Sequence, residues 1–174
     1  DAHCIEYLLS TINSVGMGTA VAPALINKSN GESFYRTPKN HWLLNIYYWF
    51  INGASGYKPG CITRAGTNVG VDHKVFEPAI VEVEWLPGGC VLHLKKNLIL
   101  KNFYPFKGKA YSEDLIHSFY LKQKNIKLIV CTSAYCYIDN VCILRNLSFQ
   151  QFIDYLKADF KARNYLVQLE SRSP

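Results

Sequence analysis

Apolar residues recur at helical spacing in three segments of the chain. In residues 2–13 this pattern predicts an amphipathic helix that packs inward. A second helix is expected to begin at Ser112, and a third after Ser148, where Ser148 and Gln151 form a capping-box pattern. The expected buried faces are Leu115, Ile116, Phe119 and Tyr120 in the second helix and Phe149, Phe152, Ile153, Leu156 and Phe160 in the third.

Patterns typical of β-strands follow in the second half of the chain. Residues 81–85 alternate between apolar and acidic side chains, which predicts a half-buried strand. Pro87-Gly88-Gly89 then provides turn chemistry, so residues 90–96 are expected to return as the second strand of a hairpin. Further strands are expected at residues 126–131, in a hairpin over residues 135–144, and at residues 165–169.

The order of these elements predicts a fold class. Residues 41–51 form an aromatic, apolar run that periodicity leaves open between a buried strand and a buried helix, and residues 52–70 are expected to form a long loop. We expect one mixed α/β (α+β) domain, with a central, mainly antiparallel or mixed sheet flanked by helices. Residues 1–69 would form its helical and aromatic portion, and residues 70–174 its sheet-and-helix core.

Composition excludes several classes and directs attention to one basic stretch. With 49% hydrophobic and 18% charged residues, the chain is unlike collagen, disordered proteins or helical membrane bundles, and no transmembrane segment is expected. The net charge is +6, and residues 93–127 hold eight lysines against Glu113 and Asp114. This stretch predicts nucleic acid or another polyanion as a partner, although an ordinary solvated face has the same composition. The candidate binding residues are Lys96, Lys101, Lys107 and Lys109.

The cysteine pattern bears on the cellular compartment. Six cysteines are present without a C-x-x-C pair, so neither a dense disulfide scaffold nor a structural zinc site is favoured. Cys131 and Cys142 lie in apolar runs and are expected to be buried free thiols. An intracellular, cytoplasmic protein is therefore favoured, while the Asn-x-Ser triplets at Asn27 and Asn146 keep a secreted origin open.

The predicted hairpin brings chemistry-bearing side chains together. With a two-residue turn, Glu84 would face His93 and Glu82 would face Lys95 on one surface, with Asp72 shortly upstream. One interpretation is a solvent-facing surface with cross-strand ion pairs. The other is a phosphodiester site in which carboxylates hold Mg²⁺ or Mn²⁺ and a lysine orients the attacking water.

Two short motifs resemble a known family. The runs Gly70-Val71-Asp72-His73-Lys74 and Ile80-Val81-Glu82-Val83-Glu84 are similar to those of the PD-(D/E)xK nuclease superfamily, closest to the nuclease-related domain, over roughly residues 70–160. The resemblance implies metal ligation by Asp72 and Glu82, with Glu6 of the first helix as an outlying acid; Glu84, on the same surface of the predicted hairpin, is a further candidate ligand. The predicted hairpin makes Glu82, His93 and Lys95 the candidate catalytic residues.

The motif departs from the family pattern at one position. Glu84 stands where the family has a lysine, so Lys95 would have to supply the ammonium group from the neighbouring strand. The resemblance therefore implies a nucleic-acid-interacting domain that is either a metal-dependent phosphodiesterase or a catalytically degenerate relative that still binds.

Two other functions stay open. The aromatic cluster Tyr47, Tyr48, Trp49 and Phe50 is compatible with a non-catalytic protein–protein interaction module, because exposed aromatic side chains are the usual anchors of interfaces. More remotely, Cys4 near a helix start and His41 before a tryptophan resemble the pair of a papain-like cysteine hydrolase.

Overall fold

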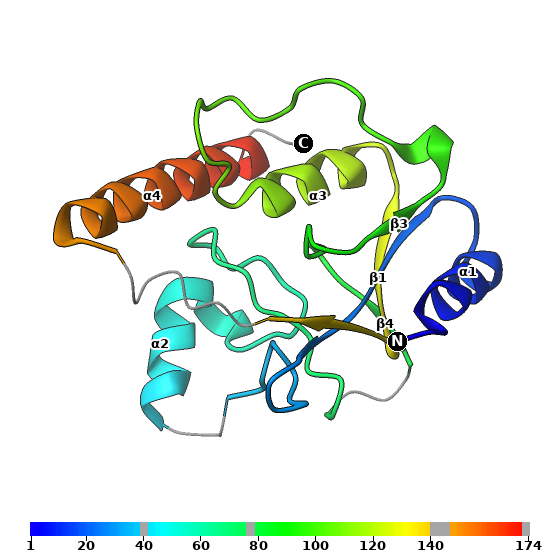
Figure 1. Cartoon of the computed structure of the whole chain (residues 1–174). Coiled ribbons are helices and arrows are strands. Elements are labelled where there is room, and N and C mark those ends of the chain that lie inside the picture. The colour runs from blue at the N-terminus through cyan, green and yellow to red at the C-terminus, as the bar shows by residue number, and fades with distance from the viewer. Residues whose placement is uncertain (39–41, 76–78, 140–146, 172–174) are drawn as a thin grey trace.

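The computed structural model describes residues 1–38, 42–75, 79–139 and 147–171. Over these stretches helices surround a four-stranded mixed sheet, so the expected α+β fold class is confirmed (Figure 1). In chain order the elements are α1 (Cys4–Val15), β1 (Thr19–Asn27), α2 (Trp42–Asn52), the 3-10 turn η1 (Gly53–Ser55), β2 (Ile80–Glu82), β3 (Leu92–His93), the 3-10 turn η2 (Lys95–Asn97), α3 (Glu113–Gln123), β4 (Lys127–Ile138) and α4 (Phe149–Ser171).

The sheet has the strand order β2-β4-β1-β3, with its two long strands in the middle. β1 and β4 are parallel, pairing from Thr19 with Lys127 to Asn27 with Ile138. The short strands β2 and β3 pair antiparallel with β4 and β1 at the two edges. All nine residues of β1 are buried, as is typical of a central strand covered on both faces.

Sequence patterns do not predict β1, and Pro23 explains why. Proline lacks the N–H that a central strand donates, so it argues against strand structure in a sequence. In the structure, the register of β1 against β4 shifts between Pro23 and Ala24, whose partners are Cys131 and Tyr135. This irregularity lets a proline stand in a central strand.

Helices cover both faces of the sheet. Leu8 and Ile12 of α1 pack against Val21 and Ile129 on one face. Alternate residues of the same strands point to the other face, where they pack against Leu121 of α3. α4 lies over α3. Leu166 of α4 packs there in a third buried cluster, whose other members are Ile62, Trp85, Leu115, Ile116 and Phe119.

The hairpin predicted over residues 81–96 is wrong, because its two strands lie at opposite edges of the sheet. Between them the chain crosses the face that α3 covers. There the indole N–H of Trp85 donates to the carbonyl of Val69 (3.0 Å), and the Leu86 N–H donates to the Ser118 hydroxyl (2.9 Å). Both Trp85 and Leu86 are buried, so apolar burial rather than a tight turn determines the path of this segment.

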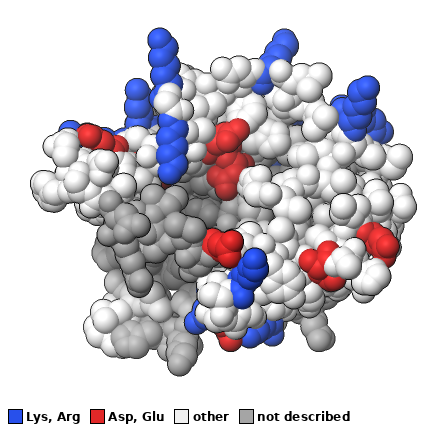
Figure 2. All heavy atoms as spheres, viewed as in Figure 1, with Lys and Arg blue, Asp and Glu red and all other residues white. Residues whose placement is uncertain are grey.

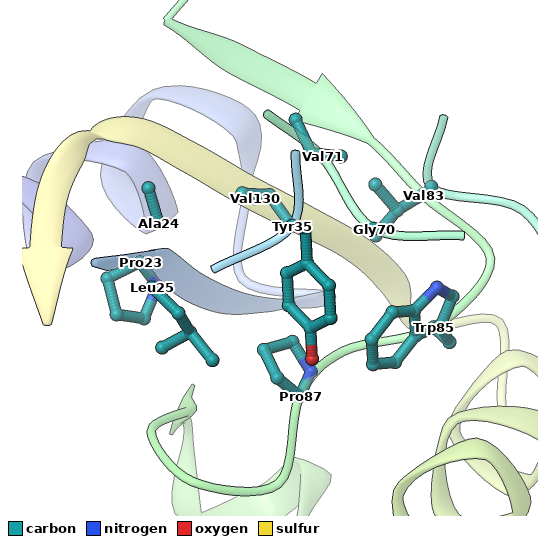
Figure 3. A pocket seen from close by; sticks show the side chains of 11 residues that line it. Pro23, Ala24, Leu25, Tyr35, Gly70, Val71, Val83, Trp85, Pro87 and Val130 are labelled. Atoms are coloured by element: carbon teal, nitrogen blue, oxygen red, sulfur yellow. The ribbon is translucent and has the colours of Figure 1, made fainter. Parts of the chain in front are cut away.

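A tight apolar core lies where this crossing segment meets β1 and β4 (Figure 3). The rings of Tyr35 and Trp85 meet edge to face, with centroids 5.4 Å apart. A Cβ atom at Gly70 would collide with the ring of Tyr35, so only glycine allows this approach. The enclosed hollow measures about 10 Å³, which is close to the room for one water molecule, so it is packing space and not a ligand site.

The start of α4 follows the sequence prediction. The Ser148 N–H donates to Oε1 of Gln151 (2.8 Å), and the Gln151 N–H donates to Oγ of Ser148 (3.3 Å), which confirms the capping box. The helix then continues to Ser171, so the strand predicted at residues 165–169 is wrong. In the hairpin predicted over residues 135–144, β4 continues to Ile138, and residues 140–144 lie outside the described residues.

The predicted burial of α4 is also wrong. Ala162 and Leu166 are buried, while the side chains expected inside are exposed or half-buried. The first half of the helix projects beyond α3 (Figure 1), and on its other side Tyr155 packs against Tyr111, with ring centroids 5.2 Å apart. We call residues 149–160 the overhang of α4. Its exposed apolar stripe consists of Phe149, Phe152, Leu156 and Phe160.

Paired substitutions in α4 can test this assignment of faces. Leu166→Ala should lower the free energy of unfolding by about 2–5 kcal/mol, because it opens a cavity in a buried cluster. Phe160→Ser, at a side chain 72% exposed, should change it by no more than about 0.5 kcal/mol. Urea unfolding at low protein concentration measures both, and equal losses would contradict the assignment.

Candidate functional site

The predicted pairing of Glu82 with Lys95 is not formed. Glu82 ends β2 at one edge of the sheet, where it pairs with Ile129 of β4, and Lys95 follows β3 at the other edge. The ammonium group of Lys95 therefore does not face Glu82 across a hairpin. This removes the arrangement in which a lysine from the neighbouring strand completes the nuclease-like motif.

Glu82 and Glu84 instead line a hollow of about 260 Å³ with Lys58 and Lys122. The carboxylate of Glu84 accepts a hydrogen bond from the Ile62 N–H (2.8 Å) and forms an ion pair with Lys58 (3.3 Å). Two carboxylates and two ammonium groups balance in charge. The structure thus brings the two predicted acids together, with Lys122 as a cation that the sequence motif does not reveal.

Asp72 lies apart from this hollow and has a structural task. Its buried carboxylate accepts hydrogen bonds from the backbone N–H groups of Thr37 (2.8 Å) and Lys74 (3.1 Å). Both bonds tie loops together. Among the residues that the structure describes, no group of three or more His, Cys, Asp or Glu side chains is arranged to hold a metal ion.

His93 meets a partner that sequence patterns do not indicate. Its ring lies 5.5 Å from that of His117, and Phe103 stacks on His117 at 5.0 Å. Burial lowers the pKa of both imidazoles, and each also lines a hollow of about 520 Å³ with Glu113 and Asp114. One histidine lies on a strand and the other on a helix, so no local spacing relates them.

The cysteines do not support a hydrolase. Cys4 is buried, and burial raises the pKa of its thiol, whereas a nucleophile needs a lowered pKa. Burial and the neighbouring thiols of Cys136 and Cys4 likewise raise the pKa of Cys90 to about 11. The other half of the pair, His41, lies outside the described residues. Cys131 is a buried free thiol as predicted, and Cys142 also lies outside the described residues.

Figure 2 shows that the basic side chains on this face stand apart from one another and form no continuous patch. Lys95 and Lys96 follow β3, and Lys101 lies in the loop beyond them. Lys107 and Lys109 line a separate groove beside the overhang of α4. The predicted polyanion residues therefore occupy at least two places.

Helix α2 is a strongly exposed apolar element of the described structure. Of its eleven residues, all of them described, Asn52 alone is buried. Trp42 and Phe50 expose 65% and 75% of their surface, and no residue from Trp42 to Asn52 carries a charge. The exposed large side chains are Trp42, Leu43, Ile46, Tyr47, Trp49 and Phe50.

Comparison with known proteins assigns no family. No protein-family model, no curated protein and no solved structure matches this chain. Among the described residues, no helix is both long enough and apolar enough to span a bilayer. The candidate sites must therefore be judged on their own geometry.

Acidification should destabilise the fold through His93 and His117. Because burial lowers the pKa of both imidazoles, the unfolded chain takes up protons that the folded chain resists. Their contribution to stability is complete above the ordinary histidine pKa of 6.5 and is lost as the pH falls from there toward the lowered values. Urea unfolding between about pH 7.5 and 5.5 should show this loss.

The double variant His93→Gln/His117→Gln should show a smaller loss over the same range. His73, whose pKa is also lowered by burial, keeps part of the dependence in that variant. Burial raises the pKa of Asp114, so this carboxyl acts in the opposite direction, which is why the range stops short of strongly acid conditions. An unchanged pH dependence in the double variant would contradict the assignment.

Proposed function

We propose that the protein is a non-catalytic protein-interaction module whose main docking surface is α2. The supporting observation is that six large apolar side chains of one uncharged helix face solvent. Burying such a side chain is worth about 1.5–3 kcal/mol, so a partner that covers several of them gains considerable binding energy. Tryptophan and tyrosine are also the residues most often found as interface anchors.

The C-terminal end of α2 is held in place by contacts with the following residues, so α2 does not need to fold when it binds a partner. The side-chain amide of Asn52 donates to the carbonyl of Gly56 (2.8 Å), and the Ala65 N–H donates to the carbonyl of Ile51 (3.1 Å). The rings of Tyr48 and Tyr57 meet with centroids 5.0 Å apart. A surface held in place before binding loses less conformational entropy in the complex.

A protein partner fits α2 better than a membrane surface does. Helices that lie in the membrane interface combine an apolar face with a strongly charged face rich in lysine or arginine. Residues 42–52 hold neither lysine nor arginine. The helix therefore lacks the charges that would hold it to anionic headgroups.

Site-specific photo-cross-linking can test this proposal. A photoreactive phenylalanine analogue at Phe50 should form discrete adducts with one or a few proteins in an extract of the source cells. Unlabelled wild-type chain should compete for these adducts, while unlabelled Trp42→Ser/Trp49→Ser chain should not, because it lacks two anchors.

A matched probe at Lys101 controls for non-specific capture, since that residue is exposed and lies on the loop after η2. The same adducts from both positions, or adducts that the double variant competes as well as wild type does, would contradict docking through α2. Transfer of the chain to neutral lipid vesicles would point to a membrane instead.

Binding of nucleic acid or another polyanion is the second candidate function. Lys127 and η2 meet at one end of the sheet, where the Lys127 N–H donates to the carbonyl of Gly18 (2.8 Å) and the Asn97 amide to that of Met17 (3.0 Å). Lys95 and Lys96 precede Asn97 directly, and none of these lysines forms an ion pair with a described carboxylate. The nuclease-like activity with Mg²⁺ or Mn²⁺ stays a prediction beside it.

Fluorescence anisotropy with a labelled single-stranded DNA oligonucleotide tests this candidate. Affinity should fall steeply as salt rises, because each neutralised phosphate releases counterions. The triple variant Lys95→Ala/Lys96→Ala/Lys127→Ala should weaken binding about tenfold or more at low salt. Lys74→Ala, which removes a lysine already paired with Glu32 (2.9 Å), should change little. Absence of binding by wild-type protein at low salt would rule the candidate out.

A further inference from the structure

Three cysteines of the described structure bring their thiols together at the start of α1, although they are far apart in the sequence. Cys4 begins α1, Cys90 follows the Pro-Gly-Gly segment ahead of β3, and Cys136 lies in the second half of β4. All three are free thiols, and the thiol of Cys90 is in hydrogen-bonding contact with those of Cys136 and Cys4. We call Cys4, Cys90 and Cys136 the thiol cluster.

The packing of α1 against β4 accounts for part of this meeting. The backbone nitrogen of Asp1 donates to the carbonyl of Tyr135 (3.2 Å), so the chain just before α1 lies beside the part of β4 that carries Cys136 (Figure 1). The Cys4 N–H donates in turn to the carbonyl of Asp1 (3.2 Å). Residues two apart in a strand share a face, so Cys136 lies on the face of Ala134, which packs in the same buried cluster as Cys4.

Cys90 can be reached from solvent and has room to move. It lines the hollow of about 520 Å³ that His93 and His117 also line, and a hollow of this size can admit part of a small molecule. Gly88 and Gly89 precede it, and a Cβ atom placed at Gly89 would meet nothing within 4 Å. Because glycine restricts the backbone least, this segment can bring the Cys90 sulfur from hydrogen-bonding contact to bonding distance.

We propose that the thiol cluster is a reversible disulfide site, in which Cys90 reacts with a small external disulfide and then bonds to Cys136. With glutathione disulfide, Cys90 loses its proton to solvent and its thiolate attacks one sulfur. The S–S bond of glutathione disulfide breaks, and one glutathione leaves as a thiolate that takes up a proton.

The second step closes the bridge within the chain. Cys136 loses its proton to solvent, and its thiolate attacks the Cys90 sulfur and displaces the second glutathione, which is protonated in turn. In total the two cysteines lose two electrons and two protons, and one glutathione disulfide becomes two glutathione thiols.

The surroundings of the two neighbouring thiols favour Cys136 over Cys4 as the bonding partner. Cys4 exposes 8% of its surface and packs with Leu8 and Ile12, whereas Cys136 is half-buried. An attacking thiol must first lose its proton, and burial opposes this by raising the pKa of the Cys4 thiol. Cys4 therefore stays reduced beside the bridge.

The surroundings of Cys90 favour the disulfide at equilibrium. Burial and the neighbouring thiols raise its pKa to about 11, so its thiolate is not stabilised. Disulfides that oxidise strongly owe this to a stabilised reduced form, which Cys90 lacks. The bridge should therefore be stable once made, and it should form slowly at neutral pH because little thiolate is present.

Peptide mapping by mass spectrometry tests the site in the folded chain. The chain is reduced, incubated with excess glutathione disulfide, quenched with acid and alkylated under denaturing conditions. The peptides of Cys90 and Cys136 should be joined by a disulfide, and dithiothreitol should return both residues to thiols. Cys61 is buried and accepts a hydrogen bond from the Asn52 amide (3.8 Å) outside the cluster, so it should be recovered alkylated.

The pH dependence identifies the thiol that attacks first. Since the thiolate is the attacking form, the initial rate of glutathione release should go on rising above pH 9.0, the ordinary pKa of a thiol. A rate that levels off at or below pH 9.0 would contradict first attack by Cys90.

Matched variants make the outcome specific. Cys4→Ala should retain the bridge between Cys90 and Cys136, and Cys90→Ser should leave Cys136 unbridged, with circular dichroism showing both variants folded. The proposal is overturned if Cys90 of the folded wild-type chain is recovered unbridged or is joined to a cysteine other than Cys136. It is also overturned if the chain unfolded in urea forms the same bridge in equal yield. The cluster contains no residue of α2, so this proposal and docking through α2 can fail separately.

Discussion

The parallel pairing of β1 with β4 constrains every other element of the fold. Both strands lie in the middle of the sheet and are covered on two faces, so a charged side chain pointing from their centre would have to lose its hydration. Parallel strands also need a long connection, and here it spans residues 28–126. The edge strands, two helices and the loops must all fit into that connection. Within this connection the chain passes from the β2 edge of the sheet to the β3 edge. It crosses the face of the sheet that α3 covers.

This crossing separates the acidic side chains of the β2 edge from the histidine and lysines of the β3 edge. The acids of β2 stay at one edge, where Glu84 is held by the Ile62 N–H and Lys58, while the imidazole of His93 and the lysines of η2 lie at the other. A hairpin would have joined the two sets. Because the buried centre of the sheet separates them, each set can act only with neighbours from other elements. Lys122 comes to the acids from the end of α3, and His117 comes to His93 from the middle of the same helix.

Local patterns predict this fold well, and choices between distant partners account for the errors. The first helix, the buried face of α3 and the capping box at Ser148 depend on spacings within a few residues, and all three are present. Alternation in residues 81–85 predicts a strand, of which the structure forms only the part up to Glu82, and it says nothing about which strand pairs with it. Pro23 hides β1 because its tolerance depends on a bulge opposite, in β4. The meeting of His93 with His117 has no signal in the sequence at all, since it depends on how α3 packs over the sheet.

The buried face of α4 was predicted wrongly for a different reason. Helical periodicity identifies an apolar stripe, but it does not show whether the same chain covers that stripe. Leu166 and the stripe at Phe149 to Phe160 have the same apolar character, yet one is buried by its own chain and the other faces solvent. An isolated helix of this length is marginally stable in water, and the overhang is held by its capping box, by continuity with the packed half, and by the contacts of Tyr155 with Tyr111 and of Asp159 with Ser112. Polar side chains would serve such a helix better if it stayed in solvent. Apolar side chains at such positions, like those of the uncharged helix α2, are explained when another surface covers them.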